Sequence, residues 1–125
     1  MENPAKILIV DDEAYIRRVI ELKLKNKGYE VITAKNGTEG LEKFKLNHPE
    51  IVITDIKMPG MDGQALCEQI KNAKNEQPCL IVVVTCSVSG SRFDWLEKIN
   101  GHLLEKPFSP SRLLELIDEF LENRK

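Results

Sequence analysis

The feature of this sequence that most constrains its fold is a strict alternation of short aliphatic runs with segments of helical period. Runs rich in branched aliphatic residues lie at 6–10, 29–33, 51–54 and 80–84, with a weaker one at 102–104. After each run, apolar residues recur three or four positions apart, as in Ile16, Ile20 and Leu24, which is the spacing of a helix that buries one face. The pattern predicts five strands, each followed by a helix.

Residues that favour helix starts agree with this division. Asn36, Asp62, Ser91 and Ser109 stand just before predicted helices, where their side chains can accept a hydrogen bond from a backbone N–H of the first turn. Strict alternation of strands and helices predicts an α/β fold, in which a doubly wound, five-stranded parallel sheet lies between two layers of helices. The continuous apolar runs at 7–10 and 80–84 are typical of central strands that are buried on both faces.

Length and charge exclude several classes of protein. A chain of 125 residues has room for one domain, which we expect to span residues 1–125, with a core at about 6–121 and no output domain. The 18 basic and 20 acidic residues give a net charge of −2, which argues against direct nucleic-acid binding. The longest apolar run, 79–84, is far shorter than the ~20 residues of a membrane helix, and the N-terminus lacks the basic start of a secretory signal. We therefore expect a cytoplasmic protein that binds no membrane.

The cysteines carry little functional signal. Cys67, Cys79 and Cys86 are odd in number and none of them forms a C-x-x-C pair, so neither a disulfide framework nor a zinc site is indicated. We expect three buried free thiols.

Polar residues follow the predicted strands at their carboxyl ends, where doubly wound sheets bind ligands. They are Asp11, Asp12, Glu13, Asp55, Thr85 and Lys106. Carboxylates gathered at one edge repel each other unless a cation neutralises them. Because the site offers oxygen ligands and no His or Cys, we expect Mg²⁺, with Mn²⁺ as a substitute.

The other groups suggest what shares this site with the metal. Lys106 can neutralise a phosphate oxygen, and the Thr85 hydroxyl can donate a hydrogen bond to another. Asp55 ends a predicted central strand, and a carboxylate can act as a nucleophile that forms an acyl phosphate. These residue types indicate a site for a phosphoryl group.

Taken together, these residues resemble the receiver domain of two-component response regulators, the CheY-like family. The resemblance runs from Lys6 to about Leu121 and rests on four segments. They are Val10-Asp11-Asp12-Glu13, Asp55-Ile56-Lys57-Met58-Pro59-Gly60-Met61-Asp62-Gly63, Thr85, and Lys106-Pro107-Phe108. It implies a flavodoxin-like sheet of order 2-1-3-4-5 and a phosphorelay signalling module that is not an enzyme, beyond catalysing its own phosphorylation and dephosphorylation.

The resemblance also implies roles for single residues. Asp55 accepts a phosphoryl group from a histidine kinase or histidine phosphotransferase. Asp11 or Asp12, with Asp55 and the backbone carbonyl of Lys57, holds Mg²⁺. Thr85 and Lys106 contact the phosphoryl oxygens, and a cis peptide precedes Pro107.

Four positions depart from, or vary within, the family pattern. Leu103 stands where an aromatic switch residue is usual, and Cys86 replaces the usual Ala or Gly. We therefore expect the surface change on phosphorylation to run through the loop after Cys86 and the neighbouring fourth helix and fifth strand, more than through a rotamer change at Leu103. Lys57 and Ser87 lie near the line of attacking water, and we expect them to slow self-dephosphorylation.

Partners and rival functions stay open at this point. Tyr15, Val19 and Leu22 widen the apolar stripe of the first helix, which is explained either by core packing or by docking of the kinase. An unknown downstream protein, or a dimer through the fourth helix and fifth strand, would carry the output. The alternatives are a Mg²⁺-dependent phosphatase with an aspartate nucleophile and a degenerate receiver that works without phosphate.

Overall fold

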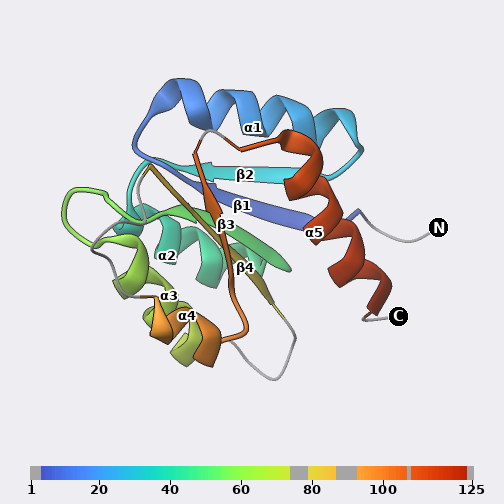
Figure 1. Ribbon diagram of the computed structural model, residues 1–125. Coiled ribbons are helices and arrows are strands. Elements are labelled where there is room, and N and C mark those ends of the chain that lie inside the picture. Colours follow the sequence, from blue (N-terminus) through green and yellow to red (C-terminus); the bar gives the residue numbers. More distant parts are fainter. Residues whose placement is uncertain (1–3, 74–78, 87–92, 107, 124–125) are drawn as a thin grey trace.

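The alternation expected from the sequence is present in the computed structural model, which describes residues 4–73, 79–86, 93–106 and 108–123 (Figure 1). The elements follow one another in the order β1 (Lys6–Val10), α1 (Ala14–Asn26), β2 (Glu30–Ala34), α2 (Gly37–Asn47), β3 (Ile51–Asp55), α3 (Gly63–Ala73), β4 (Leu80–Thr85), α4 (Asp94–Lys98), β5 (His102–Glu105) and α5 (Pro110–Asn123).

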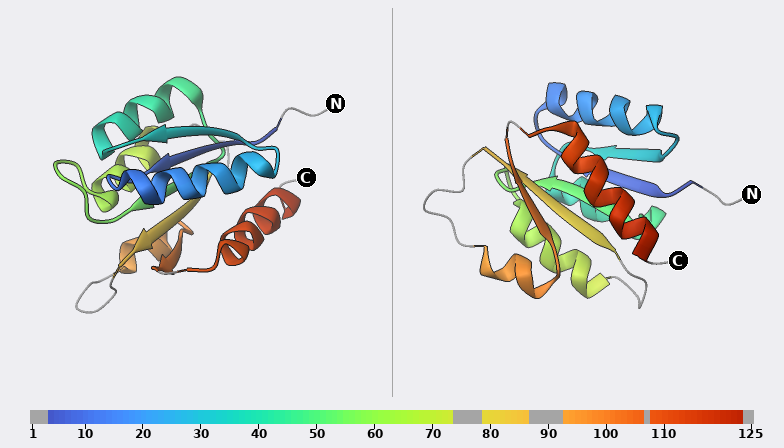
Figure 2. Two further views of the ribbon diagram at one scale, coloured as in Figure 1. Left: turned by 90° about the horizontal axis from the view of Figure 1, so that it is seen from above. Right: turned by 45° about the vertical axis from the view of Figure 1, so that its right-hand side comes forward.

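All strand pairs are parallel, and the sheet order is β2-β1-β3-β4-β5. This confirms the predicted fold class and strand order. Helices α1 and α5 cover one face of the sheet, and α2, α3 and α4 cover the other (Figure 2).

The two faces of the central strands explain their continuous apolar sequences. Ile7 and Ile9 of β1 belong to the core beneath α1 and α5, whereas Leu8 and Val10 belong to the core beneath α2, α3 and α4. Side chains of a strand alternate between faces, so a strand that is covered on both sides must be apolar throughout. Every residue of β3 and β4 is buried, including the polar residues at their carboxyl ends.

Three strands run one residue further than the sequence predicted. β3, β4 and β5 include Asp55, Thr85 and Glu105, whose pairing continues the ladder: Asp55 lies opposite Val84, and Thr85 lies opposite Glu105. Asp55 and Thr85, which we expected at the strand ends, are therefore held by the sheet itself. β2 begins at Glu30, one residue late, because the N–H of Tyr29 donates to the carbonyl of Leu24 at the end of α1.

The helix starts agree with the capping signals in the described residues. Asn36 Oδ1 accepts from the N–H of Glu39, and Asp62 Oδ1 from that of Ala65, each at 2.8 Å. Ser109 Oγ accepts from the N–H of Ser111 at 3.2 Å. Ser91 lies outside the described residues.

The expectation of three buried thiols is partly wrong. Cys67 is buried in α3, Cys79 is partly buried and Cys86 is exposed, all as free thiols. Cys86 is exposed because it follows the last residue of β4 and leaves the sheet. Within the part of the chain that the structure describes, no helix has the length and apolar character needed to cross a membrane.

Candidate functional site

Four carboxylates meet at the carboxyl end of the sheet. Asp11, Asp12 and Glu13 follow β1, and Asp55 ends the neighbouring β3. One carboxylate oxygen from each lies within 4.8 Å of those of the others. Asp11 and Asp55 are buried, whereas Asp12 and Glu13 are exposed, so the cluster has a buried floor and an open outer side.

Asp11 is the most deeply placed acid of the cluster. Its Oδ1 accepts from the backbone N–H of Glu13 at 2.9 Å. Burial raises the pKa of the Asp11 carboxyl, the Glu13 N–H and Lys106 lower it, and the charge of Asp55 raises it again, so that the net shift is upward. A buried carboxylate whose ionised form is disfavoured gains most from an additional cation.

Lys106 places a positive charge against these carboxylates. It follows β5, and its Nζ lies 3.3 Å from Asp11 Oδ2, 3.3 Å from Asp55 Oδ2 and 3.5 Å from Glu13 Oε1. Burial lowers the pKa of Lys106, but the charges of Asp11 and Asp55 outweigh it and the net shift is upward. Lys106 therefore stays a full positive charge at neutral pH.

Asp55 is held by the backbone that follows it. Its Oδ1 accepts from the N–H of Ile56 at 2.7 Å. The N–H of Gly63, the first residue of α3, donates to the carbonyl of Ile56 at 2.8 Å, which closes the loop 56–62. A Cβ on Gly63 would collide with the backbone carbonyl of Asp55, so only glycine allows α3 to begin this close to the site.

Lys57 lies on the outer side of the same loop. It is exposed, and with Ile56, Met58, Pro59 and Asp62 it lines an open hollow of about 560 Å³. Its side chain is therefore in solvent, two residues after Asp55 of the acid cluster. The role of its backbone carbonyl as a metal ligand stays a prediction.

The switch candidates lie on the other side of the site. Thr85 is buried at the end of β4, and its carbonyl accepts from the N–H of Lys106 at 2.7 Å. Leu103 of β5 is partly buried and packs against the core beneath α2, α3 and α4, as do Phe93 and Trp95. Exposed Cys86 shares a groove with Lys106. Pro107 and Ser87, and the loop after Cys86, lie outside the described residues.

Two residues of the site were not assigned a role from the sequence. Glu13 belongs to the acid cluster and lies 3.5 Å from Lys106. Its position as the third consecutive acid after β1 was the sequence feature that could have indicated this. Arg17, on the first turn of α1, donates from its guanidinium to the carbonyl of Asp11 at 2.6 Å. A single Arg in a helix that has many basic residues gives no sequence signal for this contact.

The donor set fits a hard divalent cation. The cluster offers carboxylate oxygens alone, some buried and some exposed, which suits Mg²⁺ because this ion binds through one or two carboxylates and keeps several waters. Lys106 offsets only part of the negative charge, since the cluster holds four carboxylates and this lysine pairs with three of them. The residues present therefore fit the expected metal.

The fold and this site agree with the comparison to known proteins. The model of the response regulator receiver domain family matches residues 7–118, and the chain belongs to this family. The family implies two-component phosphorelay signalling.

Relatives and solved structures support the same family. The chain is 40% identical over 111 residues to a probable transcriptional regulator ycf27 of Cyanophora paradoxa, covering 89% of this chain and 46% of the relative. It is 34% identical over 111 residues to the response regulator MprA of a Mycobacterium strain, covering 89% and 48%. A CheY-like receiver domain from Methanospirillum hungatei superposes with a TM-score of 0.87 at 30% identity, covering 96% and 95%. The chain spans about half the length of the curated relatives named here.

Proposed function

We propose that this protein is a phosphoacceptor signalling module in which Asp55 receives a phosphoryl group from a histidine kinase or histidine phosphotransferase. One observation carries the proposal: the ammonium group of Lys106 lies 3.3 Å from both Asp11 and Asp55, beside an open cluster of acids. A lone carboxylate would repel an incoming phosphoryl group. A carboxylate with an adjacent lysine and a cation site attracts it.

The transfer step uses Asp55 as nucleophile. An Asp55 carboxylate oxygen forms a bond to phosphorus, the phosphorus–nitrogen bond of the donor phosphohistidine breaks, and the histidine nitrogen keeps the electron pair and takes a proton from water. Lys106 offsets the negative charge of the phosphoryl oxygens. The Thr85 hydroxyl, at the neighbouring strand end, is our candidate donor to one of those oxygens.

The residues that would hold Mg²⁺ are Asp11, Asp12 and Asp55, with the backbone carbonyl of Lys57. The bound ion would neutralise phosphoryl oxygens as charge builds up on them during transfer. Asp12 is exposed and Asp55 is buried, so this chain offers one ligand from each side of the cluster. Glu13 adds a further carboxylate at the rim.

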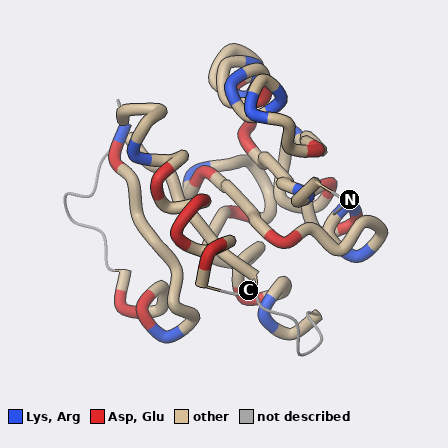
Figure 3. The backbone as a smooth tube through the Cα atoms, turned by 90° about the vertical axis from the view of Figure 1, so that its right-hand side faces the viewer, with Lys and Arg blue, Asp and Glu red and all other residues tan. Residues whose placement is uncertain are grey.

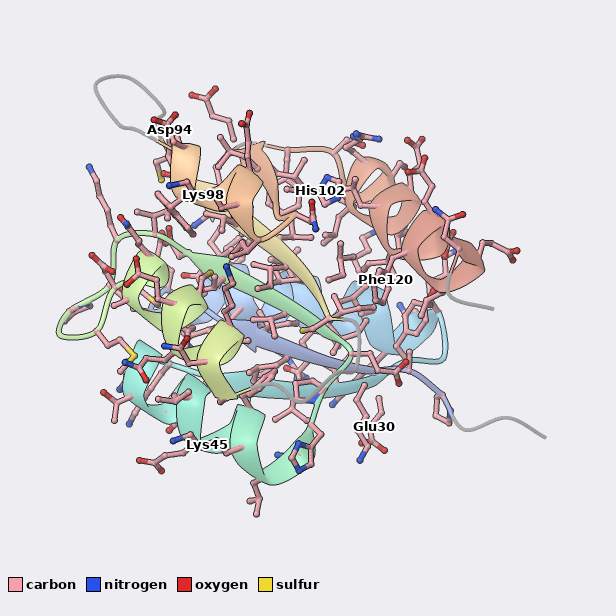
Figure 4. The ribbon with its side chains drawn as sticks, turned by 90° about the horizontal axis from the view of Figure 1, so that it is seen from below. Glu30, Lys45, Asp94, Lys98, His102 and Phe120 are labelled. Carbon is pink, nitrogen blue, oxygen red and sulfur yellow. The ribbon has the colours of Figure 1, made fainter. Side chains whose placement is uncertain are left out.

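We place the output on the surface near α4 and β5. Asp94, Lys98 and His102 lie along this edge of the molecule (Figure 4), and all three are exposed. An added phosphoryl group beside Thr85 would act on this surface through the end of β4 and the segment after Cys86. The binding partner there would be a downstream protein or a second copy of the domain.

A phosphatase is the alternative from another functional class. Enzymes that use an aspartate nucleophile in the manner of haloacid dehalogenases need a second acid two residues further on, and this chain has Lys57 there, exposed to solvent. Lys57 does not supply the second carboxyl group that such an enzyme requires. A receiver that works without phosphate is disfavoured because the acids and the lysine stand together.

Intact mass spectrometry tests these alternatives. The protein is incubated with acetyl phosphate and Mg²⁺, and a single phosphoryl adduct is expected that is lost in Asp55→Asn. Asp62→Asn is the matched control, because Asn keeps the helix cap to Ala65 and the adduct should remain. Acetyl phosphate turnover without an adduct would support the phosphatase, and neither adduct nor turnover would support the degenerate receiver.

A further inference from the structure

An apolar groove runs between α1 and α5, the two helices on one face of the sheet. It has a volume of about 420 Å³, and its walls include Ile16 and Val19 of α1 and Leu114 of α5, with Phe108 and Pro110 at the start of α5. Its inner end reaches residues of the phosphoacceptor site. It therefore borders that site, and its walls are apolar where the site is charged.

Large apolar side chains of α1 stand exposed along this groove: Tyr15 and Val19 line it, and Leu22 lies next to them on the helix. Tyr15 is 78% exposed, Val19 38% and Leu22 45%. Their spacing of four and three residues places them along one stripe of the helix. Core packing is thus the wrong explanation for this stripe, and an exposed apolar stripe beside an apolar groove indicates an interaction surface.

The two helices carry opposite charge. Helix α1 has four basic side chains and one acidic one, a net charge of +3, whereas α5 has four acidic side chains and one basic one, a net charge of −3. In Figure 3, blue predominates on α1, seen end-on at the top, and red predominates on α5 near the C-terminus. Within α1, Arg18 and Lys25 pair with Glu21, and within α5, Arg112 pairs with Glu115.

We propose that a second copy of this chain binds here, with α1 of each copy against α5 of the other. A two-fold axis makes such a contact twice, so the basic helix of each copy meets the acidic helix of its partner. The exposed stripe with Tyr15 and Val19 fills the partner's groove. A different protein with an acidic helix would complement α1 but would leave the acidic α5 beside it uncompensated, which is why the charges favour a second copy.

This contact goes beyond the proposed phosphotransfer and does not depend on it. The groove includes Glu13 and Lys106, so a copy seated there approaches the phosphoacceptor site from one side. A second copy bound here would compete for α1 with a kinase that docks on the same helix. The paired form would therefore be the resting form, and the donor would act on the single chain.

Sedimentation equilibrium over a range of protein concentrations tests the contact. A weak dimer, with a dissociation constant of roughly micromolar order or above, is expected for a small interface. Val19→Glu should weaken it at least about tenfold, since a buried unpaired charge costs more than ~1.4 kcal/mol. Leu46→Glu is the matched control, because Leu46 is 81% exposed on α2 and lies outside the groove. A chain that stays monomeric at all concentrations would overturn the proposal.

A charge exchange tests which helices meet. Lys23 lines the groove on α1, and Glu115 follows the groove residue Leu114 on α5. Lys23→Glu alone and Glu115→Lys alone should each weaken the dimer, because each homodimer then sets like charges against each other twice. An equimolar mixture of the two variants should restore it, because both opposite-charge pairs form again between unlike chains.

Other outcomes would contradict the proposed face. If the mixture of the two charge variants does not regain the wild-type level of dimer, α1 does not pair with α5. If the dimer is lost in Lys98→Glu but kept in Val19→Glu, the contact lies on α4 instead. Acetyl phosphate labelling of Val19→Glu should stay at the wild-type level, so that failure of the dimer and failure of the phosphoacceptor proposal remain distinguishable.

Discussion

The ammonium nitrogen of Lys106 lies 3.3 Å from Asp55 Oδ2 and equally close to Asp11 Oδ2. Lys106→Met would leave two buried carboxylates facing each other without this cation. We expect a loss of about 1–3 kcal/mol in the free energy of unfolding without metal, measured by urea denaturation in EDTA. Lys98→Met, at an exposed position of α4, should change the stability by no more than about 0.5 kcal/mol. Equal losses in the two variants would show that the ion pairs of Lys106 do not stabilise the fold.

Mg²⁺ should stabilise the folded chain through the acid cluster. At a concentration ten times its dissociation constant, a ligand that binds only the folded state adds about 1.4 kcal/mol, which thermal unfolding with and without Mg²⁺ would detect. Asp12→Ala should abolish this gain without unfolding the protein, because Asp12 is exposed. Glu42→Ala, an exposed acid of α2, should retain it. A full Mg²⁺ effect in Asp12→Ala would remove Asp12 from the metal site.

Tyr29 should make stability fall at alkaline pH. Its hydroxyl donates to Asp118 Oδ1 at 3.0 Å, and burial, together with this bond and the charge of Asp118, raises the pKa of Tyr29 to about 12. Because the folded state favours the protonated hydroxyl, this contribution is complete below the unfolded pKa of about 10 and is lost as the pH rises through about 12.

Chemical denaturation between neutral and strongly alkaline pH measures this effect. Tyr29→Phe should lower the free energy of unfolding by about 0.5–1.5 kcal/mol near neutral pH, the net value of one hydrogen bond. It should also reduce the fall in this free energy at alkaline pH. Tyr15→Phe serves as the control because Tyr15 is 78% exposed, and its curve should follow that of the wild type. If the free energy of unfolding of Tyr29→Phe falls as steeply with pH as that of the wild type, another group causes the alkaline loss of stability.

Lys57 should lengthen the life of the acyl phosphate. Its exposed side chain belongs to the loop that directly follows Asp55, from which we expect it to cover the phosphoryl group against attacking water. We expect Lys57→Ala to lose the phosphoryl group severalfold faster, followed by intact mass after removal of the donor. Lys71→Ala, an exposed residue at the end of α3, should decay at the wild-type rate. An unchanged decay in Lys57→Ala would count against shielding.

Leu22 should affect transfer from a kinase but not from a small molecule. A kinase that docks on α1 would contact this 45% exposed side chain, and Leu22→Glu would place a charge in the contact. We expect slower transfer from the phosphorylated kinase domain and an unchanged rate with acetyl phosphate. Leu46→Glu controls for a new surface charge. Slowing with both donors would indicate damage to the site itself.

The fold was predictable because few arrangements bury five aliphatic runs that alternate with amphipathic helices. Apolar strands such as β4 can only lie between two layers of helices, and parallel strands bring their carboxyl ends to one edge. That reasoning, with the family resemblance, also predicted that Asp11, Asp55 and Lys106 lie together, and in the structure the Lys106 ammonium nitrogen is 3.3 Å from a carboxylate oxygen of each acid.

Contacts of long flexible side chains were not predictable in the same way. The reach of Arg17 to the carbonyl of Asp11 depends on a rotamer and not on spacing. The exposure of Tyr15 and of Cys86 depends on how far α5 approaches α1 and on where β4 ends. Sequence periodicity gives the face of a helix, but it does not say how much of that face its neighbours cover.

The closure of the loop 56–62 by Gly63 limits how this protein can diversify. The N–H of Gly63 is bonded to the carbonyl of Ile56, and the backbone carbonyl of Asp55 fills the space where a side chain at position 63 would begin. The loop consequently has a set length, and an inserted or deleted residue would pull the first turn of α3 away from Asp55. Variation among descendants of this sequence is therefore expected as substitutions at solvent-facing positions such as Lys57, with the spacing from Asp55 to Gly63 preserved.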